Sequence, residues 1–236
     1  MLELVTLPAA FGMRNVSPFC LKIEMLLKSL DLPFTLGELG NPGKAPKGKL
    51  PFLVADGKKI ADSELITEYL DAETGGEVYA GLSKEQKAQG VALARLIEDH
   101  LYWLLVASRW ADEDWWPNVE RDFFGNLPVI VRQLVARLAR RRVIQTIQLH
   151  GLGRHSLEEQ KGFARRDLEA LAAAVPAEGF LFGDTPGIFD FTVAGFMAGV
   201  YDNQPVTWVT ELAVDYDRLR AYTERVQEAV GVWGRK

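Results

Sequence analysis

The four residues Ser17–Cys20, Ser-Pro-Phe-Cys, join a short apolar run to an amphipathic stretch with helical spacing. Ser17 is a good N-cap, because its hydroxyl can accept a hydrogen bond from a free amide of the first turn, and Pro18 suits the first helical position. A strand that ends in such a turn directs a hydroxyl and unpaired N–H groups at one point, which favours an anion. We expect that anion to be a thiolate.

A second group of polar residues lies in the segment 48–63. Two apolar runs flank Asp56–Gly57, which is typical of a tight β-hairpin. Pro51 opens the first of these strands, and a cis Leu50–Pro51 bond would explain its place, although only about 5% of X-Pro bonds in folded proteins are cis. Asp62–Ser63 then puts an acid and a hydroxyl at the start of another helix.

The order of these motifs resembles the thioredoxin-like half of the glutathione transferases. Within that superfamily the chain is most similar to the failed-axon-connections and metaxin-like branch. The resemblance extends over nearly the whole chain, and it is carried by the segments Ser17–Glu24, Gly48–Phe52, Ala61–Ser63, Glu98–Trp103 and His150–Ser156.

The resemblance implies a role for each polar residue at the glutathione site. Ser17 would contact the glutathione sulfur and act as the catalytic residue, and Phe19 would be one of the glutathione-binding residues. The Leu50–Pro51 step would hold the cysteinyl backbone, and Lys49 would reach the glycine carboxylate. The pair Asp62–Ser63 would hold the γ-glutamyl end. Glutathione is thus the expected co-substrate, and no metal is expected.

An aromatic cluster follows the first long helix of the C-terminal part. It consists of Tyr102, Trp103, Trp110, Trp115 and Trp116. By resemblance, Tyr102, Trp103, Arg109 and Trp110 would form the acceptor pocket opposite the sulfur. The alternative is an interdomain core, which aromatic side chains commonly fill. Arg109 could bind an acidic substrate or pair with Asp112 on the surface.

Cys20 is the only cysteine of the chain, so no intrachain disulfide can form. A Cys-Pro-x-Cys pair would perform thiol-disulfide exchange, but here the first position is Ser17. Cys20 falls on the inner helical face with Ile23 and Leu27, where an apolar environment raises the pKa of a thiol. We therefore expect a buried, inert cysteine.

The chain changes once from mixed to purely helical patterns. Residues 1 to about 70 predict strand, helix, strand, hairpin and helix, with a Gly- and Pro-rich loop at 32–47 that either covers a ligand or simply connects. We predict an α/β thioredoxin-like N-terminal domain at 1–74, a linker at 75–82 and an all-α helical-bundle C-terminal domain at 83–236.

Several local signals organise the helical part. Ser83–Gln86 and Ser156–Glu159 are capping boxes. Gly187 stands where glutathione transferases usually have a Ser or Thr cap, three residues before the retained Asp190, and glycine is a tolerable substitute. Two apolar stripes have helical spacing: Leu93, Leu96, Ile97, Leu101, Leu104 and Leu105, then Val129, Val131, Leu134, Val135 and Leu138.

Composition is that of an ordinary globular protein, with 48% hydrophobic and 25% charged residues among 236. The net charge of −5 argues against nucleic acid as a partner, so the basic run at Arg137 and Arg140–Arg142 is expected to be a solvated helix end. The three histidines lack metal-ligand spacing.

No apolar run is long enough to span a membrane. Because the first charge is acidic and only one cysteine occurs, we expect a cytoplasmic location.

These patterns favour a glutathione transferase-like enzyme that activates glutathione for attack on a small apolar electrophile. The alternative is a non-catalytic, metaxin-like binding or adaptor protein. A third reading is a glutathione-dependent isomerase or dehalogenase with the same cofactor site. A homodimer is expected from the superfamily resemblance alone.

Overall fold

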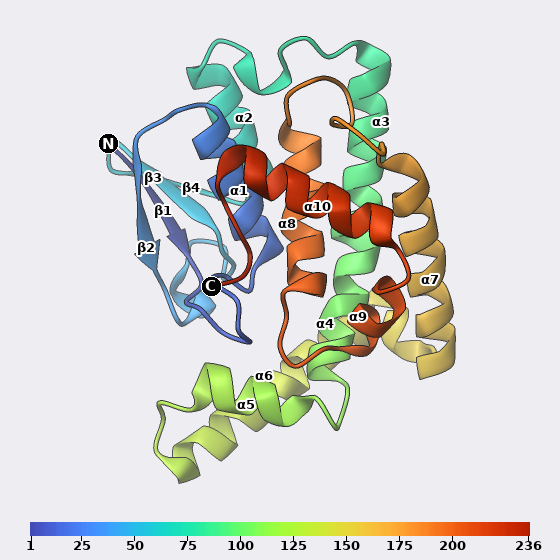
Figure 1. Cartoon of the computed structure of the whole chain (residues 1–236). Coiled ribbons are helices and arrows are strands. Elements are labelled where there is room, and N and C mark those ends of the chain that lie inside the picture. Colours follow the sequence, from blue (N-terminus) through green and yellow to red (C-terminus); the bar gives the residue numbers. More distant parts are fainter.

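The computed structural model describes all residues from Met1 to Lys236 (Figure 1). Its N-terminal part contains a four-stranded sheet in the order β2-β1-β3-β4. Strands β1 and β2 are parallel, whereas β1–β3 and β3–β4 are antiparallel. The strands are β1 (Leu2–Thr6), β2 (Phe34–Glu38), β3 (Phe52–Ala55) and β4 (Lys58–Ala61).

The predicted hairpin is confirmed, because β3 and β4 pair across the two-residue turn Asp56–Gly57. Both turn residues have positive φ, 49° and 79°, as the right-handed twist of a tight hairpin requires. Helices α1 (Pro18–Ser29) and α2 (Ser63–Glu73) follow β1 and β4. Together with the sheet they form the thioredoxin-like unit.

The rest of the chain is helical, as predicted. Helix α3 (Lys84–Arg95), a π-helical turn (Leu96–Leu101) and α4 (Tyr102–Trp110) follow one another without a break. The later helices are α5 (Trp116–Phe124), α6 (Val129–His150), α7 (Leu157–Ala174), α8 (Ile188–Tyr201), α9 (Trp208–Ala213) and α10 (Asp217–Val230). Short 3-10 turns occur at Pro42–Lys44, Glu77–Tyr79 and Leu152–Arg154.

Helix α8 is the centre of the molecule, and every residue from Ile188 to Val200 is buried. It packs against α1, which Figure 1 shows between the sheet and α8. Gly195 permits this close contact, because a Cβ at that position would lie 2.9 Å from the backbone oxygen of Pro18. The core therefore continues from the sheet through α1 into the helical part.

The predicted caps of the helical part are confirmed. Ser83 with Gln86 and Ser156 with Glu159 make both hydrogen bonds of a capping box. The carboxylate of Asp190 accepts hydrogen bonds from the amides of Gly187 and Leu181, both at 2.9 Å, and from the Tyr222 hydroxyl. Glycine thus serves as the α8 cap because Asp190 supplies the side-chain oxygen.

Two segments differ from their predicted structure. The predicted second strand exists, but it lies within residues 32–47, for which the sequence predicts a loop. Backbone pairing of β2 with β1 outweighs the glycine that lies within the strand. Trp116, predicted to lie in the loop after the first long helix, is the first residue of α5. Pro117 fits the first turn of that helix, where its missing N–H costs nothing.

The second apolar stripe of the helical part does not face the core. Its members are Val129, Val131, Leu134, Val135 and Leu138, which are 37% to 62% exposed, and Ile130 between them is 85% exposed. Figure 1 shows α5 and the first half of α6 projecting from the body of the molecule. No other element covers the outer face of this projection.

Candidate functional site

Strand register brings the three predicted motifs to one edge of the sheet. Because β1 and β4 both run antiparallel to β3, the end of β1, the start of β3 and the end of β4 lie together. Ser17 follows β1 and begins the crossover helix, Leu50–Pro51 precedes β3, and Asp62–Ser63 follows β4. These residues are distant in sequence but share this edge.

Ser17 is the N-cap of α1, as predicted, with φ −95° and ψ 115°. Its hydroxyl oxygen accepts a hydrogen bond from the Cys20 amide at 3.3 Å, and its own amide donates to Asn15 Oδ1 at 3.0 Å. The hydroxyl also forms a side-chain hydrogen bond with the Cys20 thiol. Rotation of the hydroxyl would let its proton meet an anion at the start of the helix instead, although the residue is only 7% exposed.

Cys20 shows what this environment does to a sulfur atom. Burial is the largest influence and raises the pKa of its thiol from 9.0 to about 11, while the hydrogen bond from Ser17 opposes that rise. The side chain is completely buried, which confirms the expected buried cysteine. The contact with Ser17 thus only partly offsets the effect of burial, and Cys20 stays protonated at neutral pH.

The Leu50–Pro51 bond is cis. Pro51 is buried at the start of β3 and Leu50 is half-buried, whereas Lys49 is exposed and makes no ion pair within the chain. A proline at the strand start leaves the ladder intact, because its missing N–H falls before the first pair. The Lys49 ammonium is therefore free to meet a carboxylate from solution.

Asp62 and Ser63 form the start of α2. Asp62 Oδ1 accepts a hydrogen bond from the Glu64 amide at 2.9 Å, and the residue has an unusual φ of 94°. The second carboxylate oxygen of Asp62 has no partner within the chain and is exposed. The Ser63 hydroxyl likewise makes no hydrogen bond within the chain. An acceptor and a hydroxyl are thus both open for a polar ligand.

Phe19 connects this edge to the helical part. Its ring packs edge-on against Tyr102, with 5.0 Å between the ring centroids, and Tyr102 continues to Trp103 at 5.3 Å. Trp103 in turn stacks on His150 at 5.3 Å. Burial raises the pKa of the Tyr102 hydroxyl. Of the predicted acceptor residues, Tyr102 thus lies closest to α1, since it alone contacts Phe19.

Arg109 is not paired with Asp112 on the surface, which corrects one of its two expected roles. Its guanidinium is buried, donates to the Gly199 carbonyl at 2.7 Å and lies 5.5 Å from the Phe11 ring. The two side chains point in different directions. Arg109 points toward α8, whereas Asp112 accepts hydrogen bonds from the amides of the loop that follows it. Burial lowers the pKa of Arg109 to about 10.

Trp110 lies apart from the other predicted acceptor residues. Its ring contacts Trp116 at 5.8 Å and Phe123 at 5.9 Å, so it packs against α5. Trp115 packs on Phe11 at 4.9 Å, and its indole donates to the Pro205 carbonyl. The aromatic cluster therefore divides into one group beside α1 and one group that anchors α5.

A narrow hollow lies along the seam between α1 and the helical part. Pro18, Phe19, Lys22, Ile97, Glu98, Thr192 and Phe196 line the hollow. A neighbouring hollow shares Lys22, Glu98 and Thr192 with it. The hollow thus begins at the same helix start that carries Ser17.

Lys22 and Glu98 were missed by sequence reasoning. Their ammonium and carboxylate groups are 2.8 Å apart, and both side chains are about nine-tenths buried. This ion pair joins α1 to the π-helical turn across the seam. The only hint in the sequence is a charged residue in a helix whose other members are mostly apolar.

Comparison with known proteins agrees with this geometry. The family model of the glutathione S-transferase N-terminal domain matches residues 18–115, starting immediately after Ser17. In structure, glutathione transferase from Populus trichocarpa has the same fold. That likeness has a TM-score of 0.61 and 13% sequence identity, over 96% of this chain and 93% of the other.

Three relatives show how the chain compares in sequence. It is 31% identical to the isoprene-epoxide glutathione S-transferase of Rhodococcus sp. (strain AD45), over 93% of this chain and 94% of that protein. It is 28% identical to failed axon connections of Drosophila melanogaster, over 75% of this chain and 44% of that protein. Metaxin-1 of Sus scrofa is 26% identical, over 84% of this chain and 64% of that protein. The chain thus spans less than two thirds of the length of the last two relatives.

None of its helices is long and apolar enough to cross a membrane. Fold, motif order and the full-length bacterial relative agree: the chain belongs to the glutathione S-transferase family.

Proposed function

We propose that the protein is a glutathione transferase that activates the glutathione thiolate for attack on a small apolar electrophile. The observation that supports this most is the meeting of three motifs at one sheet edge. Ser17 would donate its hydroxyl proton to the sulfur, and Leu50–Pro51 would hold the cysteinyl backbone. Asp62–Ser63 would bind the γ-glutamyl end, and Lys49 would bind the glycine carboxylate.

The energetics of thiolate formation fit a single hydroxyl and a helix N-terminus. A free thiol has a pKa of about 8.5, so only a few per cent is thiolate at pH 7. Lowering that pKa by about 2 requires about 2.7 kcal/mol of differential stabilisation. One charge-assisted hydrogen bond contributes about 1.5–3 kcal/mol, and the N-terminus of α1 adds to it.

The electrophile class follows from the bacterial relative, whose name gives an isoprene epoxide as its substrate. In such a reaction the thiolate sulfur forms a bond to one epoxide carbon, the C–O bond breaks, and the resulting alkoxide takes a proton from water. Tyr102 and Trp103, next to Phe19, would provide the apolar surface for the electrophile. Trp110, which packs against α5, is not part of this surface, and the buried Arg109 is engaged by the Gly199 carbonyl.

Conjugation of glutathione to a small apolar epoxide, measured as loss of free thiol, tests the proposal. We expect the Ser17→Ala variant to lose most of this activity while still being retained on immobilised glutathione. If the wild-type chain is not retained on immobilised glutathione, the result favours the hypothesis of a non-catalytic binding or adaptor protein instead. Failed axon connections and the metaxins, which match along this chain, are the observation behind that alternative.

Glutathione-dependent isomerisation or dehalogenation would use the same glutathione site with a different acceptor. Product analysis distinguishes it, because an isomerase returns free glutathione whereas a transferase consumes it. The homodimer and the cytoplasmic location stay predictions. Light scattering of the purified chain measures the first, and fractionation of cells that express it measures the second.

A further inference from the structure

The projection formed by α5 and the first half of α6, residues 116–142, is here called the α5–α6 arm (Figure 1). Its inner side is held to the body. Asp122 accepts a hydrogen bond from the Phe11 amide at 2.7 Å, and Arg140 donates to the Trp110 carbonyl at 2.9 Å. The arm is thus a fixed part of the fold with a free outer face.

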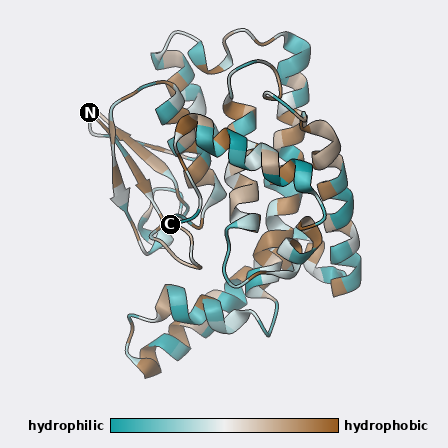
Figure 2. Ribbon diagram, in the orientation of Figure 1, coloured by the Kyte–Doolittle hydropathy of each residue, from teal (hydrophilic) through white to brown (hydrophobic).

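The outer face of α6 carries two adjacent rows of apolar side chains. Ile130, Leu134 and Leu138 follow one another at four-residue intervals, and Val131 and Val135 form the neighbouring row. All five are exposed, and Ile130 and Leu134 are the most exposed, at 85% and 62%. Figure 2 shows the free end of α6 as apolar ribbon. This is a convex ridge of branched aliphatic side chains.

Arginines continue the same face toward the body of the molecule. Arg137, Arg141 and Arg142 are exposed and make no ion pair or hydrogen bond through their side chains. By contrast, Arg132 and Arg140 are paired with Glu120 and Glu113. The unpaired arginines follow directly on the apolar rows, since Arg141 and Arg142 lie three to four residues beyond Leu138.

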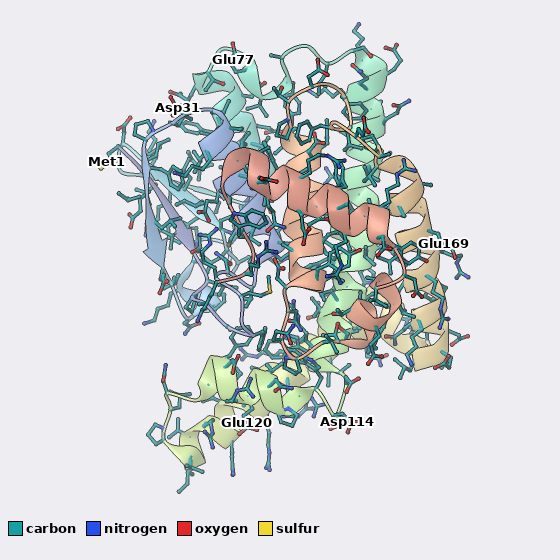
Figure 3. The ribbon with its side chains drawn as sticks, in the orientation of Figure 1. Met1, Asp31, Glu77, Asp114, Glu120 and Glu169 are labelled. Atoms are coloured by element: carbon teal, nitrogen blue, oxygen red, sulfur yellow. The ribbon has the colours of Figure 1, made fainter.

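Charge separates this face from the rest of the chain. Residues 126–142 contain five arginines and no acidic residue, a formal charge of +5, so the remaining residues carry −10 of the total of −5. Glu120, which Figure 3 shows on α5, and Asp122 are the acidic side chains of the arm. An acid-free basic end on an acidic protein fits an anionic surface.

A second copy of the chain fits this face poorly. A two-fold contact through this face would pair each patch with its own copy. Residues 126–142 contain no acidic side chain, so the unpaired arginines of one protomer would find no opposite charge on that stretch of the other. A fluid anionic lipid surface meets no such obstacle. It accepts a convex apolar ridge without a matching groove, and its phosphates meet the arginines at the headgroup level.

We propose that the α5–α6 arm docks on the surface of an anionic membrane. The rows Ile130, Leu134, Leu138 and Val131, Val135 enter the boundary between headgroups and acyl chains, and Arg137, Arg141 and Arg142 bind lipid phosphates. This interaction is peripheral and reversible. It uses none of the residues proposed to bind glutathione.

Sedimentation of the full chain with lipid vesicles tests the proposal. One set of vesicles consists of phosphatidylcholine and the other of phosphatidylcholine with phosphatidylglycerol. We expect binding to the anionic vesicles to be at least about tenfold tighter, and about 0.5 M NaCl to weaken it, since salt screens surface charge. The variants Leu134→Gln with Leu138→Gln, and Arg137→Gln with Arg141→Gln, should each lower binding by about tenfold or more.

The control is Leu157→Gln, an equally apolar and 47% exposed residue at the start of α7, which should bind like wild type. All replaced residues are exposed, so unchanged melting temperatures show that the variants fold. Equal binding by wild type and both arm variants would overturn the proposal, as would no binding to anionic vesicles. A wild-type dimer that the Leu134→Gln, Leu138→Gln variant dissociates would overturn it too, by assigning the face to a second copy.

Discussion

At residue scale, the proposed chemistry depends on the proton of the Ser17 hydroxyl. The hydroxyl oxygen already caps α1 by accepting from the Cys20 amide, so the group can donate to an anion without leaving the helix uncapped. The partial positive charge at the N-terminus of α1 also stabilises an anion at this position. The hydroxyl and the helix therefore act on the anion together.

Replacing Ser17 by Ala should therefore impair the reactivity of bound glutathione more than its binding. Without the hydroxyl, the pKa of the bound thiol should rise by 1 to 2 and the conjugation rate at pH 7 should fall about 10- to 100-fold. Ultraviolet titration of the bound thiolate gives this pKa directly. Ser17→Thr, which retains a hydroxyl, is the control and should keep a low thiol pKa; an unchanged pKa in Ser17→Ala would contradict the assignment.

Cys20 makes the stability of the fold depend on alkaline pH. Burial raises the pKa of its thiol from 9.0 to about 11, so the unfolded chain loses this proton first as the pH rises. The contribution is complete below pH 9 and the free energy of unfolding should fall by up to about 2.7 kcal/mol between pH 9 and 11. Urea denaturation of wild type and Cys20→Ala checks this, because only wild type should show this part of the decline.

At element scale, the fold depends on the close packing of α1 against α8. Gly195 lies at their contact, where an added Cβ would be 2.9 Å from the Pro18 oxygen and 3.1 Å from the Lys22 nitrogen. Both neighbours are backbone atoms of α1, so neither can rotate away. The two helices would have to separate to accept any side chain.

Gly195→Ala should therefore destabilise the protein by about 1–3 kcal/mol, although alanine is the better helix former. Gly162 in α7 offers a matched control, because a Cβ there would have no neighbour within 4 Å. Gly162→Ala should stabilise by about 0.5–1 kcal/mol. Denaturant titrations of the two variants measure both effects, and a neutral Gly195→Ala would show that α1 and α8 are not tightly packed.

The elements that the sequence predicts well are those with local signals. Ser17, Ser83 and Ser156 begin helices because a side-chain oxygen meets an amide two or three residues away, and these contacts need no tertiary structure. Strand β2 was not located, since its identity depends on pairing with β1. The helical spacing of apolar residues also predicts the second apolar stripe, which lies on α6. Spacing alone does not show whether another element covers this stripe, and the structure leaves it exposed.

At the scale of the whole molecule, the sequence predicts the thioredoxin-like and helical parts but not the contacts between them. The Lys22–Glu98 ion pair joins the two parts across 76 positions. Within the helical part, the hydrogen bond from Arg109 to Gly199 is equally non-local, at 90 positions. The three glutathione-site motifs were found because their order in the sequence resembles a known family. The residues predicted for the acceptor pocket do not form an ordered series of motifs in the sequence. In the structure, the aromatic residues among them lie in two separate groups.

Breaking the Lys22–Glu98 pair should weaken the junction between the two parts. Removing one charge leaves the other buried without its partner, so Lys22→Met should cost about 3–5 kcal/mol of unfolding free energy. Lys22→Met combined with Glu98→Met should recover part of that loss. The exposed pair Lys161–Glu158 is the control, since Lys161→Met should cost less than about 1 kcal/mol. If Lys22→Met and Lys161→Met lowered the free energy of unfolding equally, the claim that the buried Lys22–Glu98 pair stabilises the junction would be wrong.

Calorimetric titration of the chain with reduced glutathione tests the central claim most directly. The account predicts saturable binding to each chain, weakened about tenfold or more by Asp62→Asn, which keeps the α2 cap but removes the charge. Asp56→Asn makes the same change at another exposed aspartate with positive φ, and it should bind like wild type. No heat from wild type, or equal binding by both variants, would contradict the glutathione site.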